Sequence, residues 1–198
     1  MSPQATRIVI VITAFMVGLL VISGVLLLAV GRSPTQVATA SAVGGPFKLI
    51  DQNGQEVTQE ALKGKPSLIF FGFTHCPDIC PTALFDMSEL YKALGPDGDK
   101  LASYFVTVDP ERDTPEVLKE YLSSFDPRLR GLTGDPQAVA AMEKAYRVYS
   151  KKVPLEGGGY TMDHTALVYL MNKDGQFVAP FNLKRKPQEA AADLKRYL

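Results

Sequence analysis

The distribution of apolar residues divides the chain into an apolar leader and one region of mixed pattern. Residues 8–31 contain no charged side chain and are mostly apolar. At about 1.5 Å per residue, a helix over these positions is roughly 36 Å long, which exceeds a bilayer core of about 30 Å. The pattern therefore predicts a transmembrane anchor over 8–31, preceded by a short N-terminal segment, 1–7.

The leader also has a second interpretation, a cleaved signal peptide. Ala38, Ala40 and Ala42 supply the A-x-A spacing of a cleavage site, but the apolar core of a signal peptide usually has only about 7 to 15 residues. The positions of Arg7 and Arg32 leave a slight positive-inside bias toward a cytoplasmic N-terminus. Residues 33–46 lack charge and aromatic side chains, so we expect 32–46 to be a flexible tether.

The remaining residues, 47–198, show the alternation of an α/β domain. Asn53-Gly54 lies between two short strand-like segments, 47–50 and 55–58, and predicts an opening β-hairpin. The apolar run 67–73 predicts a strand buried on both faces. Apolar residues then recur at helical spacing over 84–94.

Further along, the pattern predicts more strands and helices in a βαβα order. Asp135 and Pro136 mark a helix start, as a cap and a first-turn proline. The predicted elements are a strand over 102–108, helices over 114–125 and 136–147, a hairpin of 165–171 with 176–181, and a closing helix over 187–198. This order predicts an α/β, thioredoxin-like sandwich with an N-terminal β-hairpin.

Composition narrows the possible functions. About 155 residues after the leader suit one domain. The part from residue 44 onward holds all 21 acidic residues but only 19 of the 21 basic ones, because Arg7 and Arg32 precede it, so its net charge is −2. A net charge of this sign and size does not provide the basic surface that a nucleic-acid-binding protein needs. Two cysteines exclude both a multi-disulfide scaffold and an iron–sulfur cluster held by four thiolates.

Cys76 and Cys80 follow the first buried strand and precede a helix. Pro81 suits the first helical position, which places Cys80 at or near the N-cap, where the helix dipole favours a thiolate. Three residues separate the cysteines, instead of the two of the usual redox motif. A redox-active disulfide between Cys76 and Cys80 and a metal site both remain open.

His164 is the candidate third ligand. It follows Gly157-Gly158-Gly159 and precedes an apolar strand, so we expect a mobile loop to bring it over the cysteines. Two thiolates and an imidazole suit Cu(I), or Cu(II) with a weak further ligand, whereas structural zinc usually takes four protein ligands. His75 is expected to point away from the site, and Asp78 and Asp163 are candidates for outer-shell charge or hydrogen bonds.

Three ordered motifs resemble the Sco/SenC proteins: GFTHCPDICP at 72–81, VDPERDTP at 108–115 and DHTALVYL at 163–170. The resemblance covers nearly the whole soluble domain. It implies a thioredoxin-like fold, copper bound by Cys76, Cys80 and His164, and a role in building the copper A site of cytochrome c oxidase. We therefore expect a single-pass protein of the bacterial inner membrane, with its domain facing the periplasm.

This interpretation predicts a copper metallochaperone with no catalytic residues. Its partners would be the copper A-bearing oxidase subunit, a copper donor and a thiol reductant. The alternative is a membrane-anchored thiol-disulfide oxidoreductase that reduces the acceptor's copper-ligand cysteines. A thiol peroxidase is disfavoured because no threonine lies three residues before Cys76, and thioredoxin itself because the chain has no tryptophan.

Overall fold

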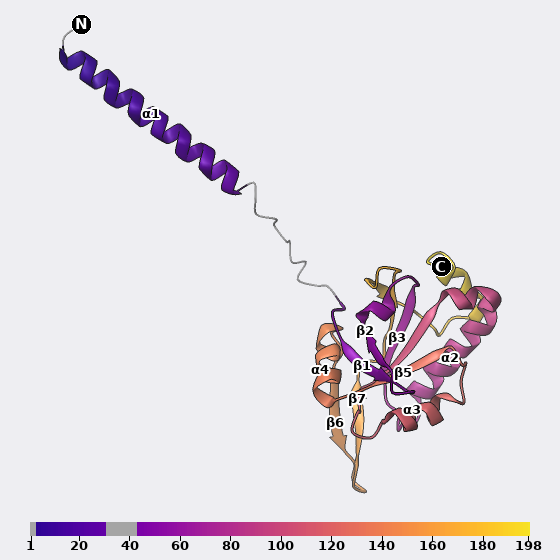
Figure 1. Cartoon of the computed structure of the whole chain (residues 1–198). Helices are drawn as coiled ribbons and strands as arrows, with labels where there is room; N and C mark the ends of the chain where they lie inside the picture. Colours follow the sequence, from indigo (N-terminus) through magenta and orange to yellow (C-terminus); the bar gives the residue numbers. More distant parts are fainter. Residues whose placement is uncertain (1–2, 31–42) are drawn as a thin grey trace. The chain divides into compact units, whose positions relative to one another are not determined.

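The computed structural model describes the backbone of residues 3–30 and 43–198, and side chains over 12–25 and 43–198. A single helix, α1 (Pro3–Val30), and the folded domain are separate units (Figure 1). Among the residues whose side chains are described, no helix is both long and apolar enough to cross a membrane. Most of the predicted tether, residues 32–42, and its possible cleavage sites lie outside the described residues.

The domain opens with the predicted hairpin of β1 (Lys48–Asp51) and β2 (Glu56–Thr58). The Asp51 carboxylate accepts the backbone N–H groups of Asn53 and Gln55, each at 2.9 Å. Gly54 has φ +76°, a conformation that glycine adopts at little cost. The turn chemistry therefore produces the hairpin as expected.

The main sheet has seven strands in the order β2-β1-β5-β4-β3-β8-β9. Its other members are β3 (Ser67–Gly72), β4 (Ala102–Thr107), β5 (Leu129–Thr133), β8 (Val168–Met171) and β9 (Phe177–Pro180). Strands β3, β4 and β5 run parallel, and β8 joins β3 antiparallel. The predicted strands are confirmed, although β5 was missed.

Helices cover both faces of this sheet, so that α4 and α2 lie on opposite sides (Figure 1). The helices of the domain are α2 (Ile79–Leu94), α3 (Pro115–Leu122), α4 (Pro136–Ala145) and α5 (Pro187–Leu194), with the 3₁₀ turns η1 (Gln59–Leu62) and η2 (Gly95–Lys100). Helices α3 and α4 begin with a proline after a capping side chain, Thr114 and Asp135 respectively, which accepts a backbone N–H. The arrangement is the predicted thioredoxin-like sandwich.

The segment before β8 differs from the expectation of an irregular loop. It forms a second, two-stranded sheet of β6 (Ser150–Pro154) and β7 (Tyr160–His164), with Ser150 paired to His164 at its base. Glycines 157–159 make the tip of this hairpin and not a hinge beside the histidine. His164 is therefore the last residue of a strand.

We predict that Gly72→Ala destabilises the domain by about 1–3 kcal/mol. A Cβ at Gly72 would lie 2.7 Å from the Phe105 ring and 2.8 Å from Cys80 Sγ, both of which are fully buried. The matched control is Gly157→Ala, whose Cβ meets no atom within 4 Å. Denaturant unfolding should separate the two variants, and equal midpoints would contradict the close approach at β3.

Candidate metal centre

Three side chains from two distant segments meet beyond the carboxyl end of β3. Cys76 lies in the turn before α2, Cys80 in the first turn of α2, and His164 at the end of β7. Their ligand atoms all lie within 4.8 Å of one another, and Cys80 Sγ is 3.6 Å from His164 Nε2. The structure therefore brings together the three residues predicted to hold the metal.

Local backbone geometry places the two sulfurs. The chain turns after β3, where the Cys76 N–H donates to the Phe73 carbonyl, and the Cys80 N–H donates to Cys76 Sγ at 3.4 Å. Gly72 lacks a side chain where Cys80 Sγ packs against the strand. Cys80 is consequently fully buried, whereas Cys76 is partly exposed.

Cys80 lies near the helix N-cap, as expected, but not at it, and Pro81 is not the first helical residue. Helix α2 begins at Ile79 with Asp78 as its N-cap, so Cys80 lies inside the first turn. Burial is the largest influence on this thiol and raises its pKa, and the neighbouring Cys76 and Asp113 raise it further. In the metal-free state the Cys80 sulfur therefore holds its proton, which a metal bound at this sulfur would have to displace.

His164 is held in the form that binds a metal. Its Nδ1 lies 3.1 Å from the Thr165 carbonyl, which only accepts, so Nδ1 carries the hydrogen and the Nε2 lone pair points toward Cys80. Burial lowers the pKa of the imidazole, which favours the neutral ring. The rings of Phe70 and Phe73 meet it edge-on, with centroids 6.4 and 5.7 Å away.

The site opens to solvent through a cavity of about 250 Å³. Cys76, His164 and both candidate outer-shell carboxylates, Asp78 and Asp163, line it. The two aspartates are exposed, and Asp163 raises the pKa of His164 only as a minor influence. His75 lies outside the cluster of ligand atoms, with Nδ1 3.1 Å from Thr74 Oγ1.

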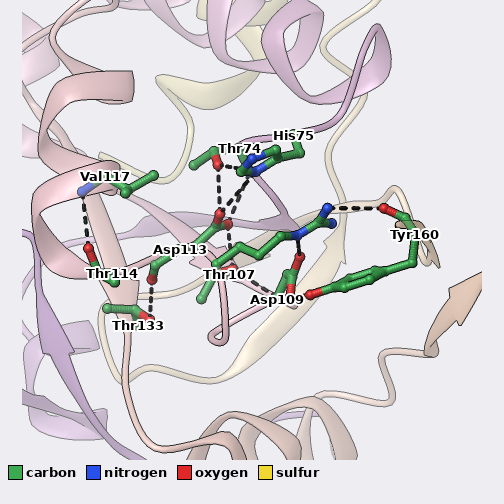
Figure 2. Close-up of polar contacts among 10 residues, drawn as sticks. Thr74, His75, Thr107, Asp109, Asp113, Thr114, Val117, Thr133 and Tyr160 are labelled. Atoms are coloured by element: carbon green, nitrogen blue, oxygen red, sulfur yellow. Dashed lines mark hydrogen bonds and ion pairs between the residues drawn. The ribbon is translucent and has the colours of Figure 1, made fainter. Parts of the chain in front are cut away.

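A buried carboxylate, whose role the sequence alone does not decide, fixes the cysteine turn. Asp113 accepts the Thr74 N–H at 3.0 Å, the Thr74 hydroxyl at 2.6 Å and the Thr107 hydroxyl at 2.7 Å (Figure 2). Its side chain is fully buried, and its own carbonyl accepts the Thr133 hydroxyl. Asp113 thereby joins the start of the cysteine turn to the ends of β4 and β5.

Comparison with known proteins places the chain in a family. The SCO1/SenC family model matches residues 35–198. The chain belongs to the SCO1/SenC family. The SCO2-like protein of Rickettsia felis is 42% identical over 155 residues, which cover 77% of this chain and 76% of that one.

Two solved structures show what SCO1/SenC relatives of this chain bind or do. The structure of Bradyrhizobium japonicum ScoI with copper bound has 66% sequence identity and a TM-score of 0.77, and covers 79% of this chain and 100% of that chain. BsSco, a Sco family member in which a disulfide switch was identified, is 28% identical with a TM-score of 0.62, over 78% of this chain and 91% of that one. The Sco family is described there as one of cytochrome c oxidase assembly proteins.

We predict that Asp113→Asn destabilises the domain by about 2–3 kcal/mol, because an amide group replaces one of two buried oxygens that accept hydrogen bonds. Asp99→Asn is the control, since its side chain is 80% exposed. Denaturant unfolding measures both. A loss no larger for Asp113→Asn than for Asp99→Asn would show that the network is not structurally required.

Proposed function

We propose that this chain is a copper metallochaperone that binds one copper ion through Cys76, Cys80 and His164. The observation behind the proposal is the meeting of two sulfurs and a neutral imidazole nitrogen within 4.8 Å. A soft, three-donor set suits Cu(I), and a weak further ligand would extend it to Cu(II). Structural zinc usually demands a fourth protein ligand, so zinc ranks below copper.

The acceptor in this proposal is the copper A-bearing subunit of cytochrome c oxidase. Copper bound to a relative of 66% identity and the oxidase-assembly role described for the Sco family support this choice. The cavity exposes Cys76 and His164, so thiolates of an acceptor can approach the ion from solvent. Exchange of ligands then passes copper on, while a separate donor supplies the ion and a thiol reductant keeps Cys76 and Cys80 reduced.

A second candidate function uses the same sulfurs, and their unequal burial favours it. Partly exposed Cys76 can attack an acceptor's disulfide, which forms a mixed disulfide and releases one acceptor thiol. Attack by Cys80 then releases the second acceptor thiol and leaves a Cys76–Cys80 disulfide for the thiol reductant. This oxidoreductase role prepares the acceptor's cysteines for metal and needs no contribution from His164.

We also propose that residues 8–31 anchor the protein in the bacterial inner membrane, with the domain facing the periplasm. The length and lack of charge of this segment support the proposal. An oxidising compartment further suits a protein whose cysteines must be reduced by a partner. The outer-shell roles of Asp78 and Asp163 belong to the same proposal, through their place at the mouth of the cavity.

The ligand assignment predicts that Cys76→Ala, Cys80→Ala and His164→Ala each weaken Cu(I) binding by at least about a hundredfold, near 2.7 kcal/mol, because a three-donor site loses a third of its ligands. His75→Ala is the matched control and should retain wild-type affinity. Anaerobic titration of the reduced full chain against a competing Cu(I) chelator measures this. Equal affinity of His164→Ala and wild type would reject the assigned ligands.

The anchor assignment predicts that the full chain stays in the membrane fraction after alkaline extraction, because an apolar helix is not released by disruption of charge contacts. A variant lacking residues 1–31 should be fully released. Protease added to the periplasmic side should cleave the anchored domain. Extracted soluble protein that begins after Ala40 or Ala42 would instead establish a cleaved leader.

A further inference from the structure

The β6–β7 hairpin carries His164 but stands apart from the main sheet. It forms a two-stranded sheet of its own, and isolated hairpins are marginally stable in water. At its base, Ser150 donates to Glu143 of α4 at 3.0 Å. The position of β7 over the cysteines must therefore depend on further side-chain contacts.

Those contacts gather at Tyr160, the first residue of β7. The Tyr160 hydroxyl donates to Asp109 Oδ1 at 2.9 Å, while Arg112 Nη1 donates to the Tyr160 carbonyl at 3.0 Å. The Arg112 guanidinium carbon also lies 3.9 Å from the centre of the Tyr160 ring. Arg112 Nε donates in turn to the second Asp109 oxygen, which closes the cluster.

Because the cluster is buried around Asp109, the loss of any of its hydrogen bonds would be costly. The Asp109 side chain is fully buried, and its two oxygens are taken by Tyr160 and Arg112. Withdrawal of Tyr160 would leave a buried carboxylate oxygen without that donor, a costly change in a medium of low polarity. Every second residue of a strand lies on the same face, so Tyr160, buried Met162 and His164 share one face of β7. The anchored tyrosine therefore fixes the face that presents the imidazole.

The same loop also holds the cysteines. Asp109 and Asp113 both lie in residues 108–114, just after β4, and Asp113 binds Thr74 beside the cysteine turn (Figure 2). One short segment thus contacts both halves of the metal site. Its two buried carboxylates, Asp109 and Asp113, contact the histidine strand and the cysteine turn respectively.

We propose that Asp109, Arg112 and Tyr160 form a clamp that positions His164 relative to Cys76 and Cys80 and so slows the release of bound copper. The inference rests on the proposed copper function. These three are positioning residues, because they act on the metal through His164. Without the clamp the hairpin keeps its base and the ion pair of Lys152 with Glu111, so the imidazole is held less firmly in its direction toward Cys80 Sγ.

The test compares Tyr160→Phe with Tyr104→Phe in the full chain. Both changes delete one tyrosine hydroxyl that donates a hydrogen bond, and the Tyr104 bond, 2.8 Å to the Ala61 carbonyl, lies outside the clamp. Tyr160→Phe should release Cu(I) to a chelator about tenfold faster than wild type, whereas Tyr104→Phe should match wild type. In a His164→Ala background, Tyr160→Phe should add nothing.

Amide hydrogen exchange of the metal-free protein supplies an independent measurement. Residues 161–164 should exchange faster in Tyr160→Phe and at the wild-type rate in Tyr104→Phe. Unchanged copper release with unchanged exchange would overturn the clamp, as would an equal acceleration of release in the His164→Ala background. If His164→Ala alone retains wild-type affinity, the ligand assignment fails instead, and the exchange result still decides whether the clamp holds the hairpin.

Discussion

Two carboxylates from one short loop, Asp109 and Asp113, lie buried at the carboxyl end of β4. Burying a charged group is costly unless hydrogen bonds and opposite charge compensate for it. Arg112 and Thr107 supply part of the compensation from the loop and the end of β4. The rest comes from residues distant in sequence, Thr74 of the cysteine turn and Tyr160 of β7. The need to satisfy two buried carboxylates therefore ties the strand-to-helix turn, the loop after β4 and the hairpin into one arrangement.

The elements that sequence could predict are those whose cause is local. Asn53-Gly54 specifies its turn, and Thr114 and Asp135 cap the helices that follow them. Strand β5 was not predictable because its polar pattern has tertiary causes. Arg130 pairs with Asp51 at 2.9 Å across the sheet, and Gly131 leaves room for Leu122, whose Cδ1 would lie 2.7 Å from an added Cβ.

The candidate metal centre shows the same difference between features with a local cause and features with a tertiary cause. The sequence singles out Cys76, Cys80 and His164 as a set because the chain offers so few soft donors, and the structure brings them together. The burial of Cys80 was not predictable, because it depends on a helix that starts at Ile79 and on packing against Gly72. The glycine run 157–159 favours a loop, which hides the strand alternation of Tyr160, Met162 and His164. Without that strand, the part played by Tyr160 had no sequence signal.

In the proposed copper metallochaperone, the unequal attachment of the three donors would suit transfer of copper better than its storage. Cys80 belongs to the core through α2, so its displacement would disturb the packing beneath β3. His164 belongs to a separate two-stranded sheet, so its displacement leaves the main hydrogen-bonded ladder intact. Because Cys76 and His164 both face the cavity while Cys80 does not, an incoming ligand meets the less firmly held donors first. In that proposal, copper release would begin at the hairpin and end at the buried sulfur, without unfolding the domain that would bind the next ion.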